Sequence, residues 1–200
     1  MSTLGRVDGY HHGDLRSACL DAALELLEEG GGDEATLSLR AVARRAGVSS
    51  NAPYRHYPDK GALLAALATR GFQELKALMI SAEAAAAPGD AFEALAQAYV
   101  RYAIDHPGLF RFMYGHPCST HPDTAAAAAE TTAVIAARLP EVVPAEQREA
   151  FMVGCWSLVH GLGSLLLDGK LSPGGPDQVT ALVHTVVATM LGPHRGAARE

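Results

Sequence analysis

Apolar residues recur with helical spacing along most of the chain, and the residues between them mark where each helix is expected to begin and end. The clearest run lies between Ser38 and Gly47, where positions i, i+3, i+4 and i+7 are Leu39, Val42, Ala43 and Ala46. The Ser38 hydroxyl can accept a hydrogen bond from a free N–H at a helix start. Gly47 can take left-handed dihedrals at little cost because it has no Cβ. The pattern predicts a short helix between these two residues.

A second short helix and a third, longer one are predicted directly downstream. Ser49 or Ser50 can cap a helix through about Tyr57, and Asp59 can cap the next one. Pro53 lies in the first turn of the second helix, where its missing N–H would have no intrahelical partner. We therefore expect Pro53 to rigidify that helix start without breaking it. Two short helices joined by a Gly-containing turn form a helix-turn-helix, whose second helix can enter a major groove.

The rest of the chain also has helical spacing, and no strand alternation persists anywhere. One helix is expected from His12 or Asp14 to the Gly30-Gly31-Gly32 stop, and the Asp59 helix should end before Pro88-Gly89. Further helices are expected over about 90–105, 109–114, 122–139, 144–168 and 176–191. We predict an all-α protein with a DNA-binding head over 10–60, a helical body over 61–192, and flexible tails over 1–9 and 193–200.

The charge distribution supports a nucleic-acid partner for the head, although the whole chain is acidic. The 200 residues carry a net charge of −6. Residues 36–60 nevertheless hold five basic side chains against one acidic one, a local balance of +4. Concentrated positive charge attracts phosphates, although a merely solvated helix face would have the same composition.

Other classes of protein leave no clear sign in the sequence. No apolar run approaches a membrane span, and no secretory leader precedes Tyr10. The three cysteines are scattered, which fits a reducing cytoplasm better than a disulfide framework. The chain has no G-x-S-x-G, no H-E-x-x-H and no phosphate-cradling Gly loop, so we expect neither an enzyme nor a cofactor.

A loop rich in Pro and His holds the one candidate metal site. His116, Cys118 and His121 are metal-type ligands with close spacing. Only three ligands are local, however, and Pro117 and Pro122 explain the segment equally well as a plain loop. A metal- or redox-responsive protein therefore stays an alternative.

A fixed spacing of residues extends over the whole of 39–60. It comprises Leu39, Val42, Ala43, Ala46, Gly47, Val48, Ser49, Pro53, Tyr54, His56, Tyr57 and Lys60. This stretch resembles the TetR family of one-component bacterial regulators, whose pattern is L-x-x-V-A-x-x-A-G-V-S-x-x-x-φ-Y-x-H-F-x-x-K, with φ apolar. Pro53 stands where the family often has Leu, and Tyr57 where it has Phe. The body, with His106-Pro107-Gly108-Leu109-Phe110 and Trp156-x-x-x-His160-Gly161, resembles a TetR subgroup named for its Trp-His-Gly signature.

The resemblance implies which residues of the head contact double-stranded DNA. Base edges would be met by Arg40, Ser50, Asn51 and Ala52, where Arg suits guanine, Asn suits adenine and Ala suits a thymine methyl. The family often has Thr in place of Ala52. Phosphates would be held by Ser38, Ser49, Tyr54, Arg55, His56 and Lys60. Arg44 and Arg45 are expected to add only to the electrostatic field, and Tyr57 to pack inside the head.

The resemblance also implies a homodimer and a small-molecule effector. Small residues recur along the helix expected over 144–168, and the last helix has a wide apolar face, so two copies can form a four-helix interface. A dimer would read a palindromic operator with half-sites roughly 34–36 Å apart. Candidate residues for an effector pocket are aromatic, Met or polar, although they equally describe an ordinary core: Phe72, Leu75, Met79, Tyr102, Phe110, Met113, Tyr114, Met152, Cys155, Trp156 and His160. The implied function is a ligand-released repressor, with an activator of the same family as the alternative.

Overall fold

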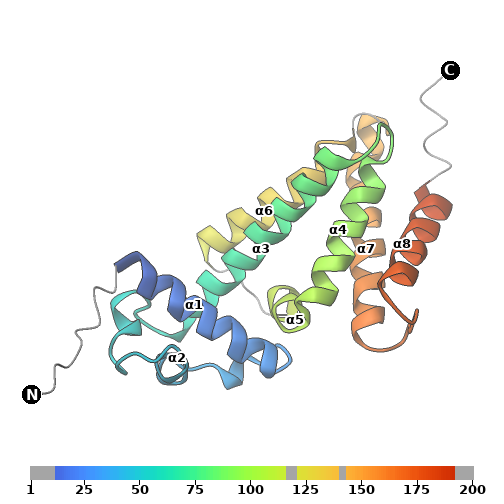
Figure 1. Ribbon diagram of the computed structural model, residues 1–200. Coiled ribbons are helices and arrows are strands. Elements are labelled where there is room, and N and C mark those ends of the chain that lie inside the picture. Colours follow the sequence, from blue (N-terminus) through green and yellow to red (C-terminus); the bar gives the residue numbers. More distant parts are fainter. Residues whose placement is uncertain (1–11, 116–120, 140–142, 192–200) are drawn as a thin grey trace, which may run out of the picture.

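The computed structural model describes residues 12–115, 121–139 and 143–191, and it places eight α-helices and no strand in these ranges (Figure 1). The head holds α1 (His12–Glu29) and α2 (Leu39–Arg45), with the 3₁₀ turns η1 (Glu34–Thr36) and η2 (Pro53–Arg55). The body holds the remaining helices, with the 3₁₀ turn η5 (Ala145–Gln147) before α7: α3 (Lys60–Ala85), α4 (Ala91–Asp105), α5 (Pro107–Gly115), α6 (Pro122–Ala136), α7 (Arg148–Leu167) and α8 (Pro176–Leu191). The predicted all-α fold is confirmed; the tails over 1–9 and 193–200 lie outside the described residues.

Helix α3 connects the head with the body. It begins in the head and runs along the body between α6 and α4, while α4 in turn packs against α7 and α8 (Figure 1). Its start follows the predicted chemistry, because the Asp59 carboxylate accepts a hydrogen bond from the Ala62 N–H at 2.8 Å. The Ser38 hydroxyl likewise accepts from the Ala41 N–H at 3.1 Å, and Gly47 has a φ of 68° at the following turn. The predicted caps at Asp59 and Ser38 and the predicted left-handed conformation of Gly47 are therefore confirmed.

The second helix of the predicted helix-turn-helix is shorter than expected. Regular structure begins at Pro53 rather than at Ser49 or Ser50, and it consists of the single 3₁₀ turn η2. Pro53 cannot donate to the Ser49 carbonyl, which instead accepts from the Ala52 N–H at 2.9 Å. At the other end, Pro58 disfavours helical dihedrals for the residue before it. The two prolines therefore confine this segment to a turn, and the expectation that Pro53 leaves a full helix intact was wrong.

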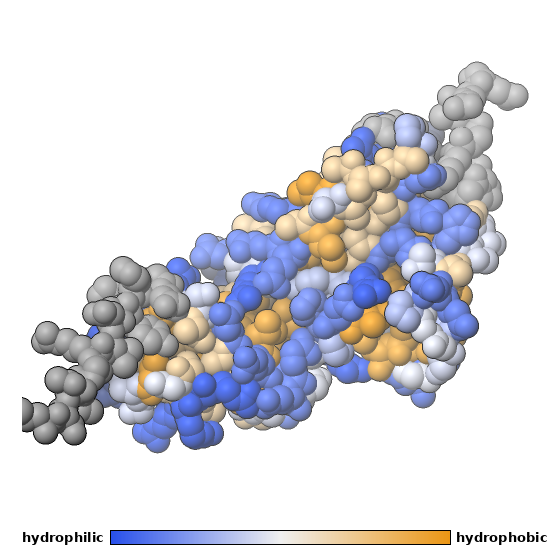
Figure 2. Space-filling model, in the orientation of Figure 1, coloured by the Kyte–Doolittle hydropathy of each residue, from blue (hydrophilic) through white to orange (hydrophobic). Residues whose placement is uncertain are grey.

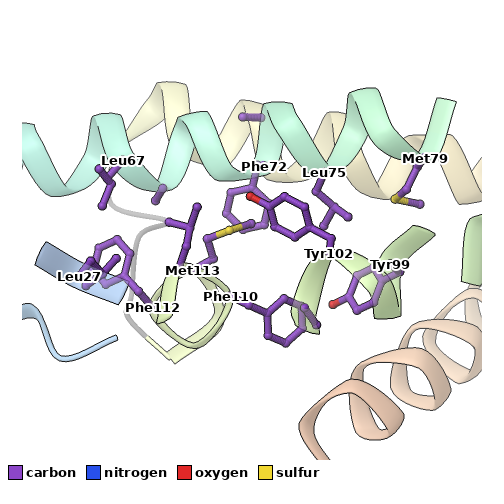
Figure 3. Close-up of a cluster of buried hydrophobic side chains, with 14 of the residues drawn as sticks. Leu27, Leu67, Phe72, Leu75, Met79, Tyr99, Tyr102, Phe110, Phe112 and Met113 are labelled. Carbon is purple, nitrogen blue, oxygen red and sulfur yellow. The ribbon is translucent and has the colours of Figure 1, made fainter. Parts of the chain in front are cut away.

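One hydrophobic core joins the head and the body. Buried side chains from α1, α3, α4 and α5 form a single cluster, and Figure 3 shows Leu27 of α1 close to Phe112 of α5 and Leu67 of α3. Gly71 lets α3 approach α5 closely, because a Cβ there would collide with the Met113 sulfur. The head is therefore packed onto the body rather than suspended from a linker.

A carboxylate of the head also caps a helix of the body. The Glu28 side chain accepts hydrogen bonds from the Gly108 N–H at 2.7 Å and from the Leu109 N–H at 3.0 Å, in the first turn of α5. These N–H groups have no partner within their own helix, and a negative charge is favourable at a helix N-terminus. Gly108 is required for this approach, since a Cβ there would lie 2.9 Å from the Leu27 carbonyl oxygen. We call this contact the Glu28 clip.

Helix α7 is unusually apolar for its surroundings. The segment Ala145–Leu167 is long and apolar enough to cross a membrane by length and composition alone. An 18-residue stretch of it has a mean hydropathy of 1.6, and only 22% of that stretch is buried. The expectation that no apolar run approaches a membrane span was therefore wrong on these criteria. A largely uncovered apolar helix usually marks an interaction surface.

Candidate nucleic-acid interface

Most of the predicted DNA contacts lie on the surface of the head. Seven of the ten residues are exposed, and they flank the turn between α2 and η2: Ser38, Arg40, Ser49, Ser50, Asn51, Tyr54 and Arg55. Leu39, Val42 and Ala43 form the buried face of α2, which leaves the Arg40 side chain at the surface. Tyr54 is 47% exposed, an unusual position for a large aromatic ring. The polar and cationic groups needed to bind a nucleic acid are thus accessible together.

Three predicted contacts are less accessible than expected. Ala52 is only 8% exposed, so its methyl group packs inside the head, and the structure does not support a contact with a thymine methyl. The Lys60 ammonium donates to the Glu34 carbonyl oxygen at 2.6 Å, which links the start of α3 to the turn η1. His56 is half-buried, and its buried Nε2 has no hydrogen-bond partner among the described residues.

Arg45 is neutralised within the head. Its guanidinium forms two hydrogen bonds with the Glu29 carboxylate, at 2.9 and 2.6 Å, and one with Glu25 at 3.1 Å. The hydrogen bonds from Arg45 lower the pKa of Glu29, which therefore stays ionised. Because both acids lie on α1, Arg45 ties α1 to α2. The local charge of +4 counted from the sequence is accordingly reduced by acids that are distant in sequence.

Tyr57 packs inside the head, as predicted. It is 1% exposed, and its hydroxyl donates to the Arg16 carbonyl oxygen at 3.1 Å. Burial raises the pKa of Tyr57, so the hydroxyl stays protonated and available as a donor. This hydrogen bond fixes the end of η2 against α1.

The proposed metal ligands lie mostly outside the described residues. His116 and Cys118 fall in the range 116–120, and His121 is exposed at the start of α6. In the ranges that the structure describes, no group of three or more His, Cys, Asp or Glu side chains could hold a metal ion. The metal alternative therefore stays untested.

The predicted effector pocket is largely filled core. Seven of its eleven residues are buried: Phe72, Leu75, Met79, Tyr102, Phe110, Met113 and Cys155. The space between Met79, Tyr114, Met152 and Trp156 is a cavity of about 30 Å³, and another of about 20 Å³ lies beside Cys155. Cavities of this size hold about one water molecule. The structure thus does not bring the eleven residues together around one ligand-sized cavity.

Three of the predicted residues do line a larger cavity. Phe110, Tyr114 and His160 face a space of about 270 Å³ between α5 and α7, with Arg111 and Asp168 among its other lining residues. Arg111 forms an ion pair with Asp168 at 3.1 Å. Trp156 lies outside this cavity and is 44% exposed.

A buried tyrosine that the sequence analysis did not select organises the aromatic cluster around His160. The Tyr99 oxygen accepts a hydrogen bond from the Trp156 indole N–H at 3.3 Å and lies 3.0 Å from His160 Nδ1. The Tyr99 hydroxyl also interacts with the Tyr114 side chain, so one buried oxygen links three of the polar groups in the cluster. The His160 ring stacks on Phe110 with centroids 5.3 Å apart, and Tyr114 meets it edge-on at 4.8 Å. The sequence signal that could have indicated Tyr99 is its spacing of three residues from Tyr102, which places both tyrosines on the buried face of α4.

Burial determines the protonation of this cluster. It raises the pKa of Tyr114 to about 12, and it raises the pKa of Tyr99 further. Burial also lowers the pKa of His160, because the charged imidazolium loses its hydration among aromatic rings. All three groups are therefore held neutral near pH 7.

Comparison with known proteins defines the class of this chain. Residues 20–67 match the family model for bacterial regulatory proteins of the tetR family, and residues 92–190 match a model described as tetracyclin repressor-like, C-terminal domain. The chain belongs to the TetR family. Regulators of this family bind DNA, form dimers and are not enzymes, so the protein is a DNA-binding transcriptional regulator. Its place in the Trp-His-Gly subgroup stays a prediction.

Individual proteins are similar to this chain over most of its length. A protein of unknown function from Rhodococcus sp. RHA1 has 34% identity and a TM-score of 0.76, over 91% of this chain and 98% of that one. LfrR, a TetR-like regulator from Mycobacterium smegmatis solved with proflavine, has 25% identity and a TM-score of 0.63, over 88% and 95%. An uncharacterised HTH-type transcriptional regulator of Mycobacterium tuberculosis is 28% identical over 178 residues, 88% of this chain and 81% of the relative.

The lowered pKa of His160 predicts a pH dependence of stability. Below the ordinary histidine pKa of about 6.5, the unfolded chain binds a proton at this site more readily than the folded chain. Stability is therefore lost as the pH falls from about 6.5 toward the lower folded pKa. We expect the free energy of unfolding in urea to fall less between pH 7.5 and pH 5.5 in His160→Gln than in the wild type.

The surface variant His121→Gln is the control for this experiment, since His121 is exposed. Its pH dependence should follow the wild type. A His160→Gln protein with the same pH dependence as both would contradict the proposed cost of charging His160.

Proposed function

We propose that this protein is a dimeric repressor in the cytoplasm that binds a palindromic operator and is released by a small-molecule effector. The observation that carries the proposal is that the molecule combines exposed polar and cationic side chains on α2, η2 and the turn between them with an uncovered apolar face on α7. Arg40, Ser50 and Asn51 would contact base edges, because all three are exposed, Arg40 in the first turn of α2 and the other two between α2 and η2. Ser38, Ser49, Tyr54 and Arg55 would contact phosphates, and Lys60 would do so only with the donors it does not use on Glu34.

The direct experiment is selection of bound DNA from a random pool, followed by a search for the selected site upstream of the gene itself. The proposal expects a two-fold symmetric site whose half-sites lie one helical turn, or a multiple of it, apart. A single asymmetric site, or no enrichment of any sequence, would contradict the paired reading heads.

Two arginines of α2 offer a matched test of the DNA contacts. Arg40→Ala removes a side chain free to donate to a base, so it should cost about 1–3 kcal/mol of affinity for the selected site and less for random DNA. Arg45 is already held by Glu25 and Glu29, so Arg45→Ala should cost less than about 1 kcal/mol on either DNA. Fluorescence anisotropy at fixed salt measures both affinities. Equal losses for the two variants, on both DNAs, would remove the proposed role of Arg40.

The proposed dimer interface follows the uncovered stripe of α7. Val153 is 50% exposed and Leu165 is 45% exposed, and between them at four-residue spacing stand Ser157 and Gly161. Apart from the adjoining part of α7, no atom of the residues that the structure describes lies within 4 Å of a Cβ added at Gly161. Met190 of α8 is a further exposed apolar residue, at 58%. Small residues on an apolar stripe allow a second copy to approach closely and would bury surface that one protomer leaves open.

This stripe predicts that Gly161→Leu breaks the dimer without disturbing the protomer. The Cβ of the added side chain points into open space in the single chain, and the Leu side chain would occupy the space of the partner helix. Sedimentation equilibrium should show a monomer at concentrations where the wild type is dimeric, with weaker binding to the selected site. Ala129→Leu, on the exposed side of α6, is the control and should stay dimeric. A Gly161→Leu protein that associates like the wild type would place the interface elsewhere.

Effector release requires that the body communicate with the head. The Glu28 clip and the ion pairs of Arg70 with Asp21 of α1 and Glu74 of α3 provide continuous contacts between them. LfrR was solved with proflavine bound, which supports a small molecule as the effector of a related body. An effector can change operator affinity only by the difference in its own affinity for the two head arrangements.

A further inference from the structure

A large, mainly apolar groove runs along the exposed side of α4. Its volume is about 830 Å³, within the usual range of small-molecule sites. One stripe of α4 forms its floor, from Ala94 through Gln97, Ala98, Arg101 and Ile104 to Asp105. The walls come from Leu78 and Ala82 of α3, from Leu166 of α7 and Val179 of α8, and from Leu171 in the connection between these last two helices. Figure 2 shows hydrophobic surface in the region of α4 and this connection.

The length of the groove limits the shape of an occupant. The α4 stripe covers eleven residue steps from Ala94 to Asp105, or about 16 Å at the helical rise. A rigid, compact molecule would leave much of this length exposed. An extended chain of roughly ten carbon atoms would cover most of it.

The polar groups of the groove limit the charge of an occupant. The Arg101 Nε–H donates to the Asp105 carboxylate at 2.8 Å, so the two charges compensate each other. The two terminal nitrogens of Arg101 have no hydrogen-bond partner among the described residues. Gln97 uses its amide N–H on the Thr180 carbonyl oxygen at 2.8 Å. The groove thus offers free donors on Arg101 beside a carboxylate that repels a second anion.

We propose that this groove binds an elongated, uncharged, apolar molecule that ends in a carbonyl oxygen. The hydrocarbon part lies along Ala94, Ala98 and the leucines of the walls, and the carbonyl oxygen accepts from the Arg101 terminal N–H groups. A carboxylate binds more weakly because Asp105 lies beside the same guanidinium. This site is separate from the small cavities at Trp156 and from the 270 Å³ cavity at His160.

The position of the groove also suits an effector site, a step that rests on the proposed function. Asp105 and Pro107 line one end of it, and Pro107 is the first residue of α5. The next two residues, Gly108 and Leu109, donate to Glu28 of the head. An occupant that contacts this end therefore lies next to the contact that fixes the head on the body.

Binding is tested on the full chain with decan-2-one as the probe and decanoate as its anionic match, by isothermal titration calorimetry. We expect decan-2-one to bind at least fivefold more tightly than decanoate. Ala94→Phe places a ring on the half-exposed floor of the groove and should weaken decan-2-one binding at least tenfold. Ala129→Phe, on the exposed side of α6, is the matched control and should bind like the wild type.

The double variant Arg101→Met with Asp105→Asn tests the polar end. It removes both charges of the ion pair at constant net charge, and it should weaken decan-2-one binding because the N–H donors for the carbonyl oxygen are lost. No binding of decan-2-one to the wild type, tighter binding of decanoate, or undiminished binding to Ala94→Phe would each overturn the proposed site.

Retardation of the selected operator, with and without saturating decan-2-one, tests the coupling separately. Release of the DNA supports an effector role, whereas unchanged operator affinity with intact binding overturns that role and leaves the site. If the chain selects no operator at all, the proposed function fails, and the calorimetric result on the groove stands by itself.

Discussion

The two hydrogen bonds from the first turn of α5 to the Glu28 carboxylate are the contact on which the arrangement of the molecule depends. Hydrogen bonds to a charged group stabilise by about 1.5–3 kcal/mol each, and these two join Glu28 to residues 80 and 81 positions away in the chain. They require close backbone approach, since a Cβ at Gly108 would lie 2.9 Å from the Leu27 carbonyl and one at Gly32 would lie 2.7 Å from the Gly108 carbonyl. The head therefore has one defined orientation on the body, which a hinge of one helix alone would not give.

A second set of contacts leads from the same joint into the core of the body. Arg70 pairs with Asp21 of the head, and its neighbour Glu74 lies 3.5 Å from the Tyr102 hydroxyl on α4. Tyr102 is buried, with its ring 4.7 Å from that of His106 just before α5. A change in the packing of α4 or α5 thus reaches the head through both the clip and this network. In a dimer held at α7 and α8, the orientation of each head on its body would set the distance between the two reading surfaces.

The sequence predicted local features better than contacts between distant segments. Ser38, Asp59 and the helical pattern sufficed for the caps and for most helix ranges, because a cap depends on neighbours within three residues. The second motif helix was overestimated because Pro53 was considered alone, whereas Pro53 and Pro58 together limit the segment to the turn η2. The neutralisation of Arg45 by Glu25 and Glu29, and the Glu28 clip, depend on folding that brings α1 beside α2 and α5. The sequence left the candidate pocket residues open between a site and a core, because an aromatic set in a cavity and one in a packed core have the same helical spacing.

The most direct test of a head held rigidly by Glu28 uses the selected operator with one base pair inserted between its half-sites. The insertion moves one half-site by about 3.4 Å and rotates it by about a tenth of a turn. Rigid heads should lose about 1–3 kcal/mol of affinity on the insertion, measured by anisotropy. Glu28→Ala, in which the clip is absent, should lose much less, whereas the exposed control Glu146→Ala should behave like the wild type. An insertion penalty that is the same in all three proteins would contradict the account.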